Sequence, residues 1–302
     1  MRVAAVDVGT NSVRLLVAEP GDPLTDVARE TRITRLGRGV DATGRLDDAA
    51  LARTLDCIAD YAQRWAALGA ARVRVTATSA VRDAADRERF FEGVQERAGV
   101  RPDVLTGEEE ARTTFAGATR SVAGEPPYLV LDIGGGSTEL IVGDERPEAM
   151  VSRQLGSVRL TESCLGADPP TPEQLDAAGH EVDRHLAAIA DRIDPTAART
   201  LIGVAGTVTT VAALHLELAS YQPERVHGTR VPADRVRELT EELARMPAQQ
   251  IASLGPMAPG REDVIVGGAL ILHRVMARYG FDEVLASEAD ILDGLALELL
   301  AG

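Results

Sequence analysis

The fold is determined by the segment Val130-Leu131-Asp132-Ile133-Gly134-Gly135-Gly136-Ser137-Thr138-Glu139-Leu140-Ile141-Val142. Its pattern predicts an apolar strand, a glycine turn and a second apolar strand. This segment aligns without gaps on residues 5–17. The aligned pairs are Asp7 with Asp132, Gly9 with Gly134, Ser12 with Ser137 and Leu15 with Leu140. Because each copy opens one half of the chain, the repeat predicts two α/β domains of one topology that face each other.

The domain boundary is expected in the sequence Val122-Ala123-Gly124-Glu125-Pro126-Pro127, whose glycine and prolines are typical of a linker. We therefore expect an N-terminal domain over residues 1–122 and a C-terminal domain over residues 123–302. The final apolar helix, expected at residues 291–300, is a candidate to cross back onto the first domain.

Periodicity predicts the remaining elements. Helices are expected at residues 46–68, 86–98, 108–118, 172–193, 208–218, 235–244 and 263–278. A hairpin is expected at residues 2–18, and further strands at residues 26–36, 73–78 and 283–286. A short strand is expected to begin at residue 104, and another strand is expected to run into the turn at residues 203–207. This alternation of strands and helices is typical of an α/β fold.

The composition limits the ligands and the compartment. The chain has 302 residues and a formal net charge of −15, which argues against nucleic-acid binding. It contains no lysine, so arginine forks, backbone N–H groups or a metal must hold any phosphate. The longest apolar run, residues 264–272, is about half of a membrane-spanning helix. With no membrane segment expected and two distant cysteines, Cys57 and Cys164, we expect a cytoplasmic protein.

Three turns are candidate phosphate-binding loops, because tight glycine turns present consecutive N–H groups. The residues are Gly9, Thr10, Asn11 and Ser12 in the first, Gly134, Gly135, Gly136 and Ser137 in the second, and Gly206 and Thr207 in the third, which opens a helix. Ordinary hairpin turns, and for the third loop a close helix–strand contact, are the alternatives.

Acidic residues supply the catalytic candidates. Glu108, Glu109 and Glu110 begin a helix, where the alternative role is to complement the helix dipole. Asp132 and Glu139 flank the glycine turn, where they could hold Mg²⁺ or only cap the turn. A further carboxylate could deprotonate the attacking water. Candidate phosphate-binding arginines are Arg14, Arg35, Arg38, Arg82 and Arg112. The histidines form no HExxH motif, and neither a GxSxG nor a Walker A motif occurs.

These motifs resemble the exopolyphosphatase and guanosine pentaphosphate phosphohydrolase family of the actin-like superfamily. The resemblance covers nearly the whole chain. It rests on residues 7–14, 35–37, 44–46, 76–82, 107–112, 132–139, 203–207 and 260–265. It implies two actin-like (ribonuclease H-like) domains with a cleft between them. It also implies Glu110 as catalytic base, Asp132 and Glu139 as metal- and water-organising acids, residues 134–137 as the phosphate clamp and Arg82 as a phosphate-binding arginine.

Two departures from the family bear on the substrate. Longer relatives carry a C-terminal helical extension, and many have a Gly-Leu-Arg stretch where this chain reads Ser287-Glu288-Ala289-Asp290-Ile291-Leu292-Asp293-Gly294. We therefore predict an exopolyphosphatase that acts on short chains of inorganic polyphosphate. We expect the enzyme to depend on Mg²⁺, with Mn²⁺ as the alternative, and to form a homodimer. Guanosine pentaphosphate phosphohydrolase, a non-catalytic polyphosphate or nucleotide sensor, and a sugar or acetate-type kinase are the other hypotheses.

Overall fold

The computed structural model describes residues 1–189 and 191–302. The chain forms two compact units, residues 1–120 together with 290–302, and residues 121–289. The first unit thus ends two residues before the expected boundary. Residues 290–302, which were expected in the C-terminal domain, belong to the first unit.

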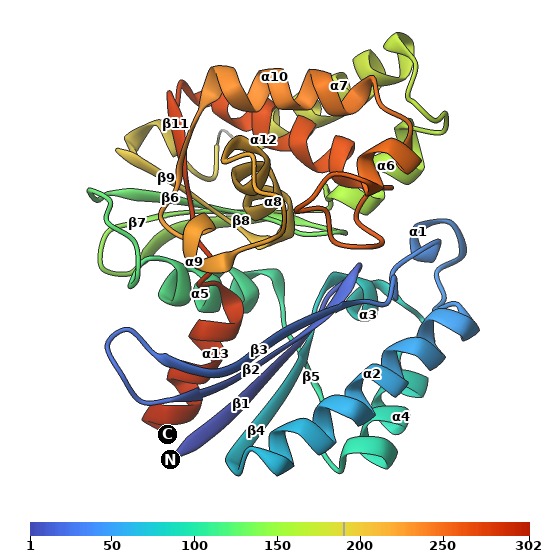
Figure 1. Cartoon of the computed structure of the whole chain (residues 1–302), viewed down its shortest axis with the longest axis vertical. Helices are drawn as coiled ribbons and strands as arrows, with labels where there is room; N and C mark the ends of the chain where they lie inside the picture. Colours follow the sequence, from blue (N-terminus) through green and yellow to red (C-terminus); the bar gives the residue numbers. More distant parts are fainter. Residues whose placement is uncertain (190) are drawn as a thin grey trace. The chain divides into compact units, whose positions relative to one another are not determined.

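The first unit contains one five-stranded sheet (Figure 1). Its strands are β1 (Arg2–Val8), β2 (Ser12–Glu19), β3 (Thr25–Ile33), β4 (Ala70–Ala77) and β5 (Asp103–Val104). They are ordered β3-β2-β1-β4-β5, with β1, β2 and β3 antiparallel in sequence and β4 and β5 parallel to β1. The predicted hairpin over residues 2–18 is confirmed.

Helices cover both faces of this sheet. They are α1 (Val40–Thr43), α2 (Asp48–Ala67), α3 (Ser79–Asp83), α4 (Glu88–Ala98), α5 (Gly107–Ala118) and α13 (Ile291–Ala301). Alternate residues of a strand point to opposite faces. Accordingly Ala4 and Val6 of β1 join a core with α2 and α4, whereas Val3 and Ala5 join a second core with α13.

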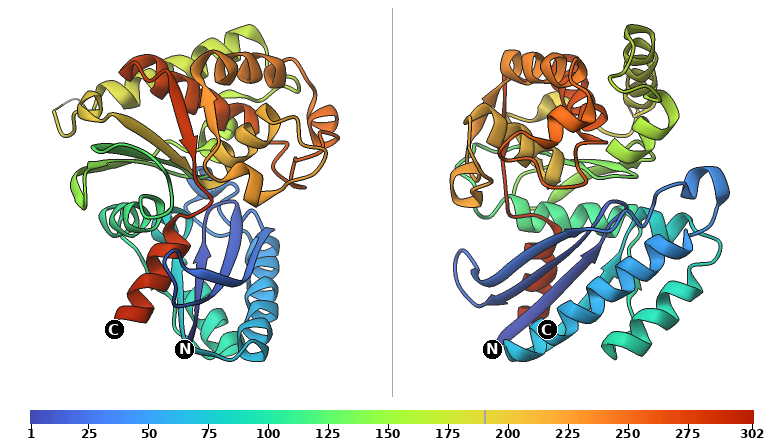
Figure 2. Two further views of the ribbon diagram at one scale, coloured as in Figure 1. Left: turned by 60° about the vertical axis from the view of Figure 1, so that its left-hand side comes forward. Right: turned by 45° about the vertical axis from the view of Figure 1, so that its right-hand side comes forward.

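Helix α13 packs against α5, and the two helices meet near the start of α13 (Figures 1 and 2). Two glycines allow this close approach. A Cβ on Gly117 of α5 would lie 1.9 Å from the carbonyl oxygen of Asp290, and a Cβ on Gly294 of α13 would lie 2.0 Å from that of Thr113. The end of the chain therefore completes the first unit.

The second unit contains a six-stranded sheet. Its strands are β6 (Tyr128–Ile133), β7 (Thr138–Gly143), β8 (Pro147–Arg153), β9 (Thr200–Val204), β10 (Arg230–Pro232) and β11 (Glu283–Ala286). The order β8-β7-β6-β9-β11 repeats the order β3-β2-β1-β4-β5, and β10 adds an antiparallel edge next to β11. The predicted duplication is thus confirmed at the level of topology.

The helices of the second unit enclose one large apolar core with the sheet. They are α6 (Ser157–Cys164), α7 (Pro172–Ala187), the 3₁₀ helix η1 (Pro195–Ala197), α8 (Ala205–His215), α9 (Pro223–Val226), α10 (Ala233–Ala244), α11 (Ala248–Ala252) and α12 (Ile265–Tyr279). Helix α7 ends before residue 193, the predicted end, and residue 190 of that prediction lies outside the described residues. Within the described part of the chain, no helix is long and apolar enough to cross a membrane.

Candidate functional site

The candidate residues gather at one edge of each sheet. In the first unit, the parallel strands β1, β4 and β5 lead into the loop at Gly9, the start of α3 and the start of α5. In the second unit, the parallel strands β6 and β9 lead into the loop at Gly134 and the start of α8. The carboxyl ends of parallel strands are the usual place for ligand binding in α/β sheets.

The glycine turn of the second unit is held from behind by α6. The carbonyl of Gly134 accepts from the amide of Ser157 at 2.9 Å, and the carbonyl of Gly135 accepts from the amide of Val158 at 2.9 Å. The carbonyl of Gly136 accepts from Nε of Arg159 at 2.9 Å. The N–H groups of Gly135 and Gly136 have no hydrogen-bond partner among the described residues, so the turn offers donors to an anion.

Gly156 makes this arrangement possible. It precedes α6, and a Cβ at this position would lie 2.3 Å from the carbonyl oxygen of Gly135. Neither Gly156 nor α6 was predicted from the sequence, because the eight-residue helix is too short to show a helical period. Only the glycine itself, between Leu155 and Ser157, signals the close contact.

The corresponding turn of the first unit has the same internal bond. The amide of Gly9 donates to the carbonyl of Ser12 at 2.9 Å, as the amide of Gly134 donates to that of Ser137 at 3.0 Å. The carbonyl of Thr10 accepts from the amide of Gly37 at 2.8 Å. The carbonyl of Asn11 accepts from the amides of Thr34 and Arg35 at 3.0 and 2.9 Å. Here the segment after β3 supports the turn.

Asp132 and Glu139 face each other across the β6–β7 hairpin. Both side chains are buried, Asp132 to 6% exposure and Glu139 to 1%. The Ser152 hydroxyl, on the neighbouring strand β8, donates to Oε1 of Glu139 at 2.6 Å. Ser152 was not predicted, since β8 begins at a proline and lacks a clear alternation of apolar and polar residues.

The donor set of this hairpin fits a magnesium ion bound through few protein ligands. Mg²⁺ prefers hard oxygens and usually takes one or two carboxylates, with phosphate oxygens and water completing its octahedron. Asp132 and Glu139 provide two such carboxylates on adjacent strands. Among residues 1–189 and 191–302, no group of three or more His, Cys, Asp or Glu side chains forms a complete metal cage. The ligand assignment stays a prediction.

Glu110 is buried near the start of α5 and lies next to Arg82. The two side chains are 9% and 24% exposed, and Nη1 of Arg82 lies 3.2 Å from Oε2 of Glu110. The same Nη1 atom donates to the carbonyl of Leu105 at 2.8 Å. Arg82 was predicted as a phosphate ligand, and the structure gives its guanidinium a further contact, which positions the Glu110 carboxylate.

The neighbouring Glu109 has a different role. Its carboxylate accepts from the amide of Thr106 at 2.8 Å, and the Thr106 hydroxyl accepts from the amide of Glu109 at 3.2 Å, which forms a capping box. The backbone N–H and hydroxyl of Thr106 lower the pKa of Glu109. The predicted alternative, a role at the helix end, therefore applies to Glu109, while Glu110 is the buried member of the triplet.

Arg14, predicted to bind phosphate, is already engaged by two carboxylates. Its Nη2 lies 2.7 Å from Oδ2 of Asp7 across the β1–β2 hairpin, and its Nη1 contacts Oδ2 of Asp290. Burial raises the pKa of Asp7, and the charge of Arg14 opposes that shift. This arrangement favours a structural role for Arg14, although its proposed phosphate contact stays a prediction.

The third candidate loop opens α8 and is covered by Arg261. Nη1 of Arg261 donates to the carbonyl of Gly206 at 3.1 Å and to the Thr210 hydroxyl at 2.7 Å. A Cβ on Gly206 would lie 2.4 Å from Nη2 of Arg261. The Thr207 side chain packs against Gly268 of α12, where a Cβ on Gly268 would lie 2.4 Å from Oγ1 of Thr207. Arg261 lies in the 260–265 motif but was not among the predicted site residues.

The remaining candidates are distributed as follows. In the first unit, the structure brings Gly9, Thr10, Asn11 and Ser12 to the sheet edge where Arg82 and Glu110 also lie. In the second unit, it brings together the 134–137 turn, Asp132, Glu139 and the start of α8. Arg112 and Arg38 are exposed.

Comparison with known proteins identifies the family. Residues 16–301 match the model of the Ppx/GppA phosphatase family. The chain is 43% identical to exopolyphosphatase 2 of Mycobacterium tuberculosis, with 99% of this chain and 98% of that protein covered. A crystal structure of an exopolyphosphatase-like protein superposes with a TM-score of 0.95 at 38% identity, covering 99% and 98% of the two chains. The Aquifex aeolicus Ppx/GppA family member gives 0.84 at 30% identity, covering 100% and 98%. The two-domain, actin-like chain therefore belongs to the Ppx/GppA phosphatase family.

Proposed function

We propose that this chain is an exopolyphosphatase that hydrolyses the terminal phosphoanhydride bond of inorganic polyphosphate. The buried Glu110 carboxylate, held by Arg82 at the carboxyl edge of the first sheet, is the observation that carries the proposal. The full-length similarity to a protein named exopolyphosphatase 2 supports the choice of substrate.

In the proposed reaction, Glu110 accepts a proton from water while the water oxygen forms a bond to the terminal phosphorus. The bond from this phosphorus to the bridging oxygen breaks, and orthophosphate and a chain shorter by one phosphate are released. Arg82 orients the Glu110 carboxylate through Nη1, which leaves its other nitrogens for a phosphate oxygen. Positioning and charge neutralisation are the main requirements of phosphoryl transfer.

The N–H groups of the Gly134–Ser137 turn bind phosphate oxygens in this proposal, and the Gly9–Ser12 turn adds further donors. Asp132 and Glu139 would hold Mg²⁺, or Mn²⁺, and Ser152 would fix the orientation of Glu139. When bound, the ion neutralises phosphate charge and orders water. Arg261 adds a positive charge at the start of α8.

Three further expectations belong to this proposal. We expect short polyphosphate chains to be preferred, because a protein of net charge −15 repels a long polyanion outside its binding residues. We also expect a homodimer and a cytoplasmic location, where neither nucleic acid nor membrane is a partner.

Guanosine pentaphosphate is the second candidate substrate, since a relative that is 32% identical over 68% of this chain is named guanosine-5'-triphosphate,3'-diphosphate pyrophosphatase. The deciding experiment measures phosphate release from polyphosphates of defined length, guanosine pentaphosphate and ATP with one preparation. We expect the largest kcat/KM for polyphosphate. A larger value for guanosine pentaphosphate would instead assign that activity, and no release from any substrate would favour a sensor.

A further inference from the structure

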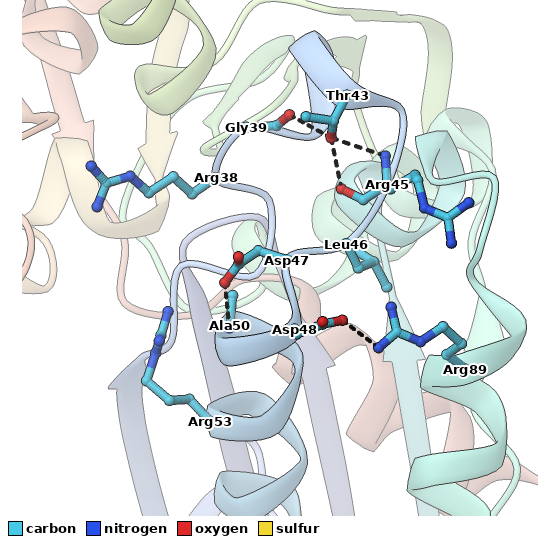
Figure 3. Close-up of a pocket in the computed structure, with 10 residues that line it drawn as sticks. All are labelled: Arg38, Gly39, Thr43, Arg45, Leu46, Asp47, Asp48, Ala50, Arg53 and Arg89. Carbon is cyan, nitrogen blue, oxygen red and sulfur yellow. Dashed lines mark hydrogen bonds and ion pairs between the residues drawn. The ribbon is translucent and has the colours of Figure 1, made fainter.

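The first unit has an arginine-rich cavity between α1, the start of α2 and α4. It measures about 740 Å³, and the charged residues lining it are Arg38, Arg45, Arg53, Arg89, Asp47 and Asp48 (Figure 3). We call this cavity the arginine pocket. Four arginines against two aspartates make its lining positive in a protein whose net charge is −15.

The two aspartates are already engaged. Oδ1 of Asp47 accepts from the amide of Ala50 as the N-cap of α2, at 2.9 Å. Oδ1 of Asp48 accepts from Nη2 of Arg89 at 2.6 Å. The two aspartates therefore neutralise only part of the positive charge of the pocket, on the side where Arg89 lies.

Arg38 and Arg53 are the arginines that remain for a ligand. Both are exposed, and both lie on the same side of Asp47 in Figure 3. Among the described residues, Arg38 has no ion pair and no side-chain hydrogen bond. Arg53 donates only to the carbonyl of Thr34, at 3.2 and 3.4 Å, and no carboxylate neutralises it within that same part of the chain.

The pocket adjoins the first glycine turn through the segment Leu36-Gly37-Arg38. The amide of Gly37 donates to the carbonyl of Thr10. A Cβ on Gly37 would lie 2.3 Å from Cγ2 of Thr10, so this segment packs tightly behind the turn. Arg38 thus follows directly on a residue that supports the proposed phosphate-binding turn.

We propose that the arginine pocket binds the phosphates of a polyphosphate chain that lie beyond the terminal, reacting one. This inference rests on the proposed function. Guanidinium groups without carboxylate partners are suited to phosphate oxygens. None of the described residues that line the pocket is aromatic, so a nucleobase would lack a stacking surface. An inorganic chain is therefore the expected occupant, with a nucleotide polyphosphate as the other source of the same chemistry.

The test compares wild type with the double variant Arg38→Gln, Arg53→Gln. Arg64→Gln is the matched control, because Arg64 lies on α2 three turns after Arg53 but bonds Glu30 outside the pocket. We expect kcat/KM for a long polyphosphate to fall about three- to tenfold in the double variant, as exposed charge pairs contribute modestly. Hydrolysis of tripolyphosphate should stay within about twofold of wild type, because the proposal places its three phosphates at the reacting site and not in the arginine pocket.

A binding measurement separates this inference from the proposed reaction. Fluorescence anisotropy of end-labelled polyphosphate reports binding even if the wild type hydrolyses nothing. Unlabelled polyphosphate and guanosine pentaphosphate serve as competitors. Weaker binding of the long chain to the double variant alone supports the pocket. Unchanged binding, or an equal loss for tripolyphosphate and the long chain, overturns it, and a loss confined to guanosine pentaphosphate assigns the pocket to a nucleotide instead.

Discussion

Arg14 lies directly across the first hairpin from Asp7, with Nη2 2.7 Å from Oδ2. In the second hairpin the register position of Arg14 is taken by Glu139, which faces Asp132. The two copies of the repeat therefore share a backbone and differ in charge. The first hairpin neutralises its own aspartate, whereas the second presents two carboxylates, which is the reason to assign the metal to the second copy.

The metal assignment predicts that Asp132→Asn and Glu139→Gln raise the Mg²⁺ concentration needed for half-maximal activity. Each substitution replaces a charged oxygen ligand with a neutral one. Ser152→Ala should shift the same curve by a smaller amount, because it removes only the hydroxyl that orients Glu139. Binding of Mn²⁺ followed by electron paramagnetic resonance provides a readout that does not depend on turnover.

The control for Ser152 is Ser163→Ala, since the partners of the exposed Ser163 hydroxyl among the described residues are backbone carbonyls of α6 and the thiol of Cys164. Its Mg²⁺ curve should match wild type. Full activity in excess chelator would remove the metal from the mechanism altogether.

The buried Glu110 and the exposed Glu109 make a matched pair for testing the base. Glu110→Gln should lower kcat by ~10²–10⁴, the usual effect of a positioned base. Glu109→Gln should leave kcat and stability nearly unchanged, because glutamine also completes a capping box with Thr106. If Glu109→Gln were the inactive variant, the base would lie one residue earlier than we assign it.

The rigid support of the phosphate turn can be tested at Gly156. Gly156→Ala places a Cβ 2.3 Å from the carbonyl oxygen of Gly135, and we expect a loss of about 1–3 kcal/mol in unfolding free energy, typical of overpacking. KM should rise as the turn moves. Gly166→Ala is the control, because its nearest neighbour is Nε2 of Gln174 at 3.7 Å. Equal behaviour of the two variants in urea unfolding and KM would contradict the support by α6.

The sequence was sufficient to predict what depends on local pattern. The duplicated hairpin, the buried strands and the capped helices follow from apolar periodicity and glycine placement, and the structure contains them. The sequence could not predict contacts that join distant segments. The contact of Arg14 with Asp290 depends on where helix α13 packs, because Asp290 is its N-cap. The contact of Ser152 with Glu139 depends on the pairing and register of β7 and β8. Residues of β8 show no alternation strong enough to reveal that strand, so Ser152 could not be found.

Three histidines of the second unit are expected to lower the stability of the protein on acidification. Burial, assisted by nearby arginines, lowers the pKa of His185, His215 and His273 below the usual value. Below about pH 6.5, the unfolded chain therefore binds more protons than the folded chain. The contribution of these histidines to the free energy of unfolding is complete above that pH and is lost as the pH falls toward their pKa values in the folded protein. The urea midpoint should therefore be lower at about pH 5.5 than at about pH 7.5. Replacing all three histidines by glutamine should reduce this difference, and an unchanged difference would assign it to other groups.

The contact between α5 and α13 connects the end of the chain to the proposed base. Gly294→Ala would place a Cβ 2.0 Å from the carbonyl oxygen of Thr113, one turn after Glu110 on the same helix. Because that neighbour is backbone, α5 and α13 must move apart, and we expect the change in α5 to displace Glu110. We expect kcat to fall about tenfold or more, as small displacements of catalytic groups are costly. Leu295→Ala is the control, because it removes a buried side chain from the core shared with β1 and β2 without adding an atom against α5. It should cost about 2–5 kcal/mol of stability while the folded fraction keeps its kcat. Turnover per folded molecule, with folding measured by circular dichroism in the same buffer, separates the two effects. A Gly294→Ala protein that loses only stability would show that Glu110 does not depend on α13.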